Sequence, residues 1–208
     1  MHPKISLIVP CWRRPMGTLQ ILFDIVNQTI SDWEAIMISD GCPIINKLFE
    51  SAALLEYKSK ASKAGSELIF HSLDKHYGGY GYEAINRGIQ LARGEFLAFA
   101  ANDDRIAPNH FANYLYPTKF NDVDLIAFES VVHETEKRTP SLRLGGIGHS
   151  EILIRASLAK SLPPHTPEYG HDWSFIESAL SATSKAVKDL RGIPTYVVCR
   201  LGHEPELE

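Results

Sequence analysis

The amino-acid sequence predicts an α/β fold, in which helices flank a mostly parallel central sheet. Short apolar runs rich in β-branched residues alternate along the chain with segments of helical spacing, which is typical of this class. The run at residues 96–100 is apolar on both faces, as in a strand that is covered on both sides. With 208 residues, 44% of them hydrophobic, the chain can bury a sizeable core, and we expect residues 1–208 to form one domain.

The first half of the chain contains the clearest elements. Residues 5–9 are an apolar run that ends at Pro10, which predicts a buried first strand. The helical spacing of Leu19, Leu22 and Val26 predicts a helix after it. We then expect a strand at 33–38, a helix at 43–61, a strand at 67–73, a helix from the glycine-rich residues 78–81 to about residue 92, and a strand at 96–100.

The second half is less regular. A loop rich in proline, glycine and charge, residues 133–148, is either a lid that orders on ligand binding or a plain surface loop. Around it we expect a strand at 125–132, a short strand at 152–154, a helix at 172–186 and a final strand at 195–200.

Polar residues follow four of the expected strands, at residues 10–14, 39–41, 76–82 and 102–104. In open α/β sheets, ligands bind outside the carboxyl ends of the strands. These four segments therefore predict one binding site along that edge of the sheet.

Asp103 and Asp104 are the sharpest feature of this edge. Adjacent carboxylates at the end of a buried strand repel each other unless a cation lies beside them. Mg²⁺ or Mn²⁺ carrying a substrate diphosphate meets that need, because these ions use few carboxylates and complete their shell with phosphate oxygens and water. The alternative is structural: Asp103 begins a turn and Asp104 caps a helix near Pro108.

Three further features each allow a structural and a functional interpretation. Residues 79–84 match the G-x-G-x-x-A fingerprint of dinucleotide sites, but their tyrosines would crowd a phosphate, which favours a tight turn near a ligand. Asp172 is either the N-cap of the helix that it precedes or a general base, with Trp173 as a flat face for a sugar ring. His203 follows the last expected strand, whose end could return to the same edge.

Composition excludes several classes of protein. The formal net charge is −4 with both signs interspersed, so no basic surface indicates sequence-specific nucleic-acid binding. Cys11, Cys42 and Cys199 form no CxxC pair, and we expect reduced thiols of an intracellular protein. No apolar run approaches the roughly 20 residues that span a bilayer, and the N-terminus lacks a signal-peptide pattern, so we expect a cytoplasmic protein.

Five motifs follow the order and spacing of family 2 glycosyltransferases, which the chain therefore resembles. They are ISLIVP at residues 5–10, ISDG at 38–41, AINRGI at 84–89, ARGEF at 92–96 and NDD at 102–104. The resemblance implies a GT-A fold, with residues 1–110 as the nucleotide-sugar half and 111–208 as the acceptor side. It also implies metal-dependent, inverting transfer of a sugar from a nucleoside-diphosphate sugar, with UDP as the expected nucleotide, to an acceptor hydroxyl.

On the donor side, the resemblance assigns nucleotide binding to Pro10, Cys11, Trp12, Arg13, Asp40, Asn102 and Asp103. Asp40 would accept a hydrogen bond from a uracil-like imide. Asp103 matches the metal-binding aspartate of the D-x-D element, whose first aspartate is replaced here by Ala101. With His203, Asp103 would bind Mn²⁺ or Mg²⁺.

On the acceptor side, Asp172 matches the aspartate of a later E-D pair and would be the catalytic base that takes the acceptor's proton. His171 replaces the glutamate of that pair. Asp104, His171 and Trp173 would bind the acceptor or support the base. The resemblance leaves the acceptor open among a saccharide, a lipid-linked molecule and a small molecule, and it leaves the oligomeric state open.

Three other functions stay open. A nucleotidyltransferase normally needs a glycine- and lysine-rich loop after the first strand, which residues 10–14 lack. A nicotinamide oxidoreductase is supported only by residues 79–84. A catalytically inactive module that binds sugar nucleotides agrees with Ala101 and His171 at positions where the family has acidic residues.

Overall fold

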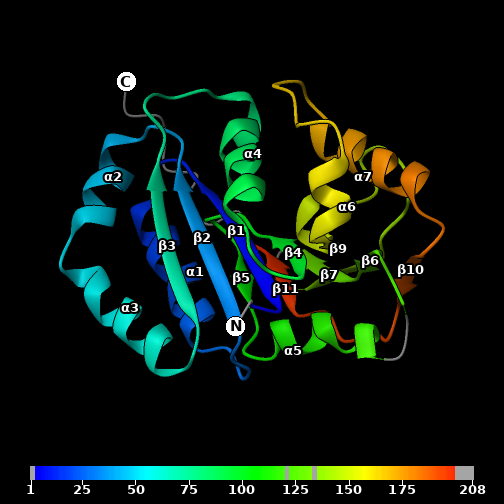
Figure 1. The fold of residues 1–208 in the computed structure, drawn as a ribbon, viewed down its shortest axis with the longest axis horizontal. Coiled ribbons are helices and arrows are strands. Elements are labelled where there is room, and N and C mark those ends of the chain that lie inside the picture. The colour runs from blue at the N-terminus through cyan, green and yellow to red at the C-terminus, as the bar shows by residue number, and fades with distance from the viewer. Residues whose placement is uncertain (1–2, 120–121, 133–134, 200–208) are drawn as a thin grey trace.

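Most of the chain is organised around one large sheet. The computed structural model describes residues 3–119, 122–132 and 135–199. Within them, seven strands pair in the order β10-β6-β9-β4-β1-β2-β3 (Figure 1). These strands are β1 (Ile5–Cys11), β2 (Trp33–Ser39), β3 (Glu67–Ser72), β4 (Phe96–Phe99), β6 (Leu125–Phe128), β9 (Ile152–Arg155) and β10 (Ala186–Asp189).

The sheet is mostly parallel, as the sequence predicts. β1 pairs in parallel with β2 and β4, and β2 with β3, so the carboxyl ends of these four strands lie at one edge. β9 is antiparallel to both of its neighbours, β4 and β6, whereas β10 is parallel to β6. The predicted α/β class is therefore confirmed.

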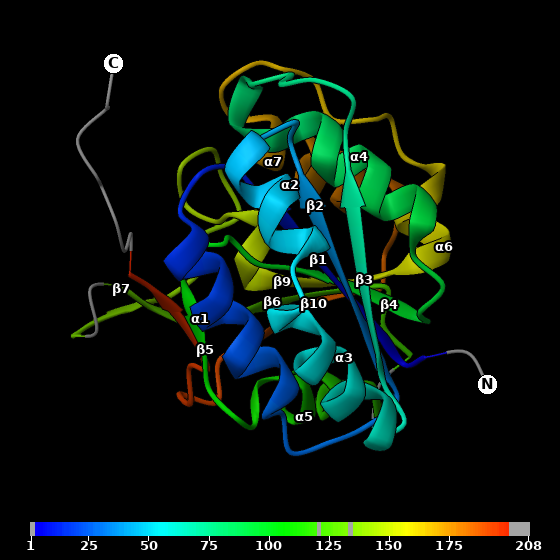
Figure 2. The ribbon, with the colours of Figure 1, turned by 90° about the vertical axis from the view of Figure 1, so that its left-hand side faces the viewer.

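Helices cover both faces of the sheet (Figures 1 and 2). One face carries α1 (Pro15–Val26), α2 (Pro43–Glu50) and α3 (Ala53–Lys63), and the other carries α4 (Tyr82–Leu91), α6 (Ala156–Ser161) and α7 (His171–Ala182). Successive side chains of a strand point to opposite faces. In β1, Leu7 and Val9 accordingly join the first core and Ile8 joins the second.

A smaller sheet, which the sequence analysis did not predict, pairs β5 (Arg105–Ile106), β11 (Tyr196–Val198), β7 (Ser130–Val132) and β8 (Glu136–Arg138) in that order. The strand expected at 125–132 is interrupted at Glu129, so that β6 belongs to the main sheet and β7 to the smaller one. α5 (His110–Leu115) and the 3₁₀ turn η2 (Pro117–Lys119) follow β5. The smaller sheet brings β11 beside the segment that follows β4.

Two predicted helices are wrong in extent. The helix expected at 43–61 is divided at Ser51, whose backbone is extended. Ile45 and Leu54 are both buried, yet nine residues at about 100° each would place them on opposite sides of one straight helix. The break lets both face the same core. The helix expected at 172–186 ends at Ala182, and Ala186 begins the edge strand β10.

In the described part of the chain, no helix combines the length and the apolar character that crossing a bilayer requires.

Candidate functional site

A cavity with a volume of about 280 Å³ lies at the carboxyl edge of the main sheet. It is bounded by the end of β1, the residues after β4, the 3₁₀ turns η1 (Gly79–Gly81) and η3 (His149–Glu151), and the start of α7. Its lining residues include Pro10, Tyr80, Ala101, His149, Tyr169, His171 and Asp172. This is the edge at which the sequence predicts a ligand.

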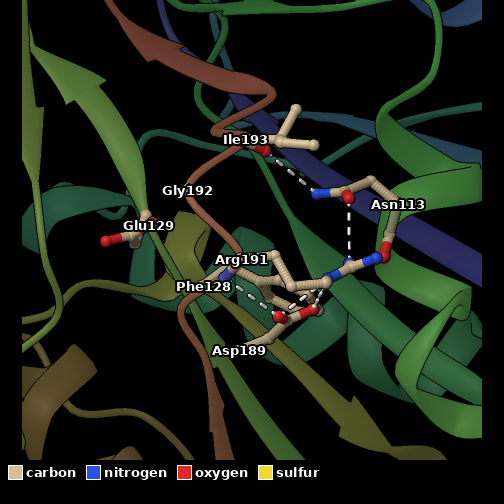
Figure 3. A pocket seen from close by; sticks show the side chains of 7 residues that line it. All are labelled: Asn113, Phe128, Glu129, Asp189, Arg191, Gly192 and Ile193. Carbon is tan, nitrogen blue, oxygen red and sulfur yellow. Dashed lines mark hydrogen bonds and ion pairs between the residues drawn. The ribbon is translucent and has the colours of Figure 1, made fainter.

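A second cavity, beside the smaller sheet, has a volume of only about 10 Å³, room for about one water molecule (Figure 3). Three of its polar side chains, those of Asn113, Asp189 and Arg191, already pair with each other. The Arg191 guanidinium lies between the carboxylate of Asp189 and the side-chain oxygen of Asn113, at 2.5 Å and 2.9 Å. The larger cavity is therefore the candidate site.

The loops after β1 and β4 hold each other in place. Arg13 and Arg14 both have left-handed backbones, with φ of 52°, a strained conformation for residues other than glycine. Arg14 forms an ion pair with Asp103 across the two loops. The side-chain amide of Asn102 donates to the Arg13 carbonyl at 3.2 Å and to the Thr18 hydroxyl at 3.0 Å. Asn102 thus links the loop after β4 to the loop after β1 and to α1.

The two adjacent aspartates have different surroundings. Asp104 is buried, and its carboxylate accepts hydrogen bonds from the Tyr196 hydroxyl at 2.7 Å and from the Cys199 amide at 2.9 Å. The helix cap that the sequence allowed for Asp104 is wrong, because α5 begins at His110 and has Asn109 at its N-cap position. Asp104 ties the end of β4 to β11, whereas Asp103 faces Arg14.

Asp40 follows β2 and is 2% exposed. Its carboxylate accepts hydrogen bonds from the backbone amides of Tyr77 at 2.9 Å and Gly78 at 3.1 Å. The His76 Nδ1 atom lies 2.9 Å from Oδ2 of this carboxylate, the oxygen that also accepts the Gly78 amide. Asp40 thereby holds the loop after β3 against the end of β2.

Aromatic and basic groups stack at the outer side of this loop. The rings of Trp12 and His76 are parallel, with centroids 3.5 Å apart, and the Arg13 guanidinium lies 5.7 Å from the Trp12 ring. Cys11 is fully buried, and burial raises the pKa of its thiol. No part of Cys11 is exposed to a ligand, and its carbonyl accepts a hydrogen bond from the Asp40 amide at 3.0 Å.

The glycine-rich segment forms the tight turn that the sequence favoured. Gly78, Gly79, Tyr80 and Gly81 all have positive φ, which brings the Tyr80 side chain to the cavity. Tyr80 and Tyr169 are 70% and 78% exposed, and their ring centroids are 5.8 Å apart. The two tyrosines form an exposed aromatic pair at the cavity, a position that the sequence analysis gave to Trp173.

Asp172 lies in the first turn of α7, after Gly170 at the N-cap position. It is therefore not the N-cap residue that the sequence allowed as an alternative. Its Oδ1 atom accepts from the Trp173 amide at 2.8 Å, and its carboxylate lines the cavity. A side chain at Gly148 would lie 3.4 Å from the Asp172 Oδ2 atom, so the glycine leaves room beside that oxygen. Trp173 packs partly buried against the second core.

Three of the predicted site residues line the cavity: Pro10, His171 and Asp172. Of the other described ones, Cys11 ends β1, Trp173 lies in α7, and the rest lie in the loops after β1, β2 and β4. His203 is outside the described residues. His149 and His165, which lie with His171 at the same wall, were not predicted as site residues from the sequence. No sequence motif links them, because their spacings of 16 and 6 residues match no common metal-ligand pattern.

Burial favours the neutral form of these three histidines. Burial lowers the pKa of His165 to about 3 and the pKa of His149 well below its usual range. Burial also lowers the pKa of His171, although the neighbouring Asp172 carboxylate opposes this shift. The cavity therefore has a neutral imidazole wall next to a carboxylate.

The chain is similar in sequence to known glycosyltransferases. The model of glycosyl transferase family 2 matches residues 6–181. The uncharacterized glycosyltransferase EpsJ of Bacillus subtilis is 26% identical over 179 residues, which cover 85% of this chain and 46% of EpsJ. The chain thus spans about half the length of that relative.

Two solved structures share the fold. Staphylococcus aureus TarS 1–349 in complex with UDP has a TM-score of 0.77 at 17% identity, over 94% of this chain and 60% of that one. Mannosyltransferase PcManGT from Pyrobaculum calidifontis, in complex with GDP-Man and Mn²⁺, has a TM-score of 0.70 at 15% identity, over 96% and 57%. With the family match over most of its length, this chain belongs to glycosyltransferase family 2 and has the GT-A fold.

Proposed function

We propose that this protein transfers a sugar from a UDP-sugar to an acceptor hydroxyl, with inversion at the anomeric carbon. The observation that carries the proposal is Asp172, a carboxylate at the wall of a cavity that lies over the carboxyl ends of β1 and β4. Solved structures of the same fold hold UDP, UDP-GlcNAc, or GDP-Man with Mn²⁺, which supports a nucleotide-sugar donor.

In this proposal, residues 1–110 bind the nucleotide. Pro10 lines the cavity, while Trp12, Arg13 and Asp40 lie beyond it, next to the loop after β3. Trp12 offers a flat face for a base, and Arg13 offers positive charge for a phosphate. Asp40 already accepts two backbone amides, so a base would have to share this carboxylate with the loop.

Asp103 is the residue that would hold a divalent cation. Its carboxylate faces Arg14, and Asp104 and Asn102 are engaged elsewhere. One carboxylate fits Mg²⁺ or Mn²⁺ that also binds the donor diphosphate, because these ions complete their shell with phosphate oxygens and water. The bound cation, with Arg14, would neutralise charge on the departing diphosphate.

Asp172 would act as the general base. The acceptor oxygen forms a bond to the anomeric carbon as the bond to the diphosphate oxygen breaks, and the acceptor's proton passes to the Asp172 carboxylate. The amide of Trp173 orients this carboxylate at 2.8 Å. Tyr80 and Tyr169 would pack against the sugar or the acceptor, since both are exposed aromatic rings at the cavity.

Calorimetric titration of UDP, GDP, dTDP and NAD, each with and without Mn²⁺, tests the donor assignment. We expect UDP to bind more tightly with Mn²⁺. Binding of NAD without metal, or the absence of any nucleotide binding, would contradict the proposal.

Asp172→Asn tests the mechanism, with Glu177→Gln on the exposed side of α7 as the matched control. We expect Asp172→Asn to keep UDP affinity and to lose about 10²-fold or more of the UDP release from a UDP-sugar. The control should keep both properties. If the unmodified protein binds UDP but turns over no UDP-sugar, the inactive binding module is the better description.

A further inference from the structure

Three histidines from separate segments converge at one wall of the cavity. His149 comes from η3, His165 from the segment between α6 and α7, and His171 from the first residue of α7. One ring nitrogen of each lies within 4.8 Å of one ring nitrogen of the other two. Such a set of imidazoles is the commonest nitrogen-ligand set for zinc and similar transition metals.

His165 is oriented as a ligand by a second residue. The Asn86 Oδ1 atom lies 3.2 Å from Nδ1 of His165 and 2.8 Å from its backbone amide, while the Asn86 amide donates to the His165 carbonyl at 3.0 Å. With the Nδ1 proton donated to Asn86, the lone pair of Nε2 points to His149, whose Nε2 is 2.7 Å away. Metal-binding histidines in proteins typically have their other nitrogen fixed in this way.

His171 contributes an independent observation. It is 6% exposed, and its Nδ1 atom has no hydrogen-bond partner. Leaving a buried polar nitrogen without a partner costs free energy, and such atoms in native proteins usually have an explanation, such as a bound ion. A metal held together with His149 and His165 provides that explanation.

The rings are also held in place by packing. His165 stacks on Phe175 with centroids 4.4 Å apart, and His149 lies 5.0 Å from Phe99 and 5.7 Å from Phe175. These aromatic neighbours limit the rotation of both imidazoles. A site of this kind would be largely preformed before a metal binds.

We propose that His149, His165 and His171 form a binding site for Zn²⁺ or a chemically similar transition-metal ion, separate from the cation site assigned to Asp103. Neutral imidazoles select such ions over Mg²⁺, which prefers oxygen ligands. Around a tetrahedral zinc ion, ligand nitrogens lie about 3.3 Å apart. To bind zinc, the Nε2 atoms of His149 and His165, now 2.7 Å apart, have to separate slightly. The ring of His171 has to move closer to them, because the ligand atoms of the three residues now lie up to 4.8 Å apart.

The metal would also affect the cavity and the segments around it. His149 and His171 line the cavity, so the remaining coordination position can take water or a ligand from it. The ion would cross-link η3, the segment after α6 and the start of α7, and it would place positive charge next to Asp172. The proposal does not depend on sugar transfer, since it rests on the three rings and their partners alone.

Metal binding by the purified chain, after removal of metal with a chelator, is the direct test. We expect one equivalent of Zn²⁺ to bind and Co²⁺ to give the intense visible absorption of a four-coordinate site, with no competition from excess Mg²⁺. If the unmodified protein binds no Zn²⁺, or if Co²⁺ shows only the weak spectrum of a six-coordinate oxygen site, the proposal is overturned.

Variants locate the ion. Asn86→Ser removes an orienting partner and should weaken Zn²⁺ binding by roughly 10–100-fold. His165→Gln and His149→Gln each remove a ligand and should weaken it more than that. His71→Gln on β3 and Asp103→Asn should bind Zn²⁺ like the unmodified protein. Circular dichroism reports whether each variant folds. Zn²⁺ affinity that is unchanged in folded His165→Gln, or that is lost in Asp103→Asn, would assign the ion to a different site.

Discussion

Gly41 controls the loop that we assign to the nucleotide base, and Gly41→Ala is a stringent test of that loop. The φ of Gly41 is +64°, and a Cβ atom placed there would lie 2.1 Å from the Lys75 carbonyl carbon and 2.4 Å from the His76 amide nitrogen. Ordinary contact begins at 3.4 Å, so the loop after β3 must retreat by about 1.3 Å to accept a methyl group.

That retreat separates Asp40 from its donors. The Tyr77 and Gly78 amides now lie 2.9 Å and 3.1 Å from the Asp40 carboxylate, and neither can keep a hydrogen bond after a shift of about 1.3 Å. Hydrogen bonds to a charged group contribute about 1.5–3 kcal/mol each, and the left-handed backbone adds about 1 kcal/mol for alanine. We expect Gly41→Ala to lower the free energy of unfolding by about 4–7 kcal/mol.

Gly65→Ala is the matched control. Gly65 also has a positive φ, +74°, but a Cβ atom there would meet nothing within 4 Å. It should cost only about 1 kcal/mol, the backbone contribution alone. For a chain of this size 1 kcal/mol shifts the melting temperature by about 2–4 °C, so thermal unfolding separates the two variants.

Nucleotide affinity gives the second measurement. UDP titration should show at least about a tenfold weaker Kd for Gly41→Ala, equivalent to about 1.4 kcal/mol, and an unchanged Kd for Gly65→Ala. Equal melting shifts for the two variants would refute the steric argument. A melting shift confined to Gly41→Ala with unchanged UDP affinity would remove Asp40 and its loop from the nucleotide site.

Two further predictions address the aspartate pair and a buried histidine. Asp103→Asn should abolish the effect of Mn²⁺ on UDP binding with little loss of stability. Asp104→Asn should lower the melting temperature, because the Asp104 carboxylate accepts hydrogen bonds from Tyr196 and Cys199. Equal losses of stability in the two variants, measured by calorimetry, would contradict this difference. Burial lowers the pKa of His110 to about 3, so the unfolded chain takes up a proton first as pH falls below 6.5. The stability due to neutral His110 is complete above pH 6.5 and decreases by about 1.4 kcal/mol per pH unit below it, down to about pH 3. Between pH 7 and pH 5, denaturant titrations should therefore show a smaller loss of stability for His110→Gln than for the unmodified protein.

The sequence was sufficient to predict the parts of the fold that local pattern determines. Apolar runs of strand length placed β1 to β4 correctly, since the alternation of buried and polar residues is encoded within each segment. The polar segments after them pointed to the edge at which the structure has a cavity. The turn at residues 78–81 was predictable for the same reason, because glycines at consecutive positions allow positive φ.

Only the tertiary structure decided which partners these segments have. The interruption at Glu129, the pairing of β11 with β7 and the attachment of Asp104 to β11 depend on contacts between residues far apart in the chain. Asp103 and Asp104 look alike in the sequence, but the structure gives one an arginine partner and the other a buried network. The imidazoles of His149, His165 and His171 meet only because η3 and α7 pack at one wall of the cavity, and no local pattern records a meeting that long-range packing creates.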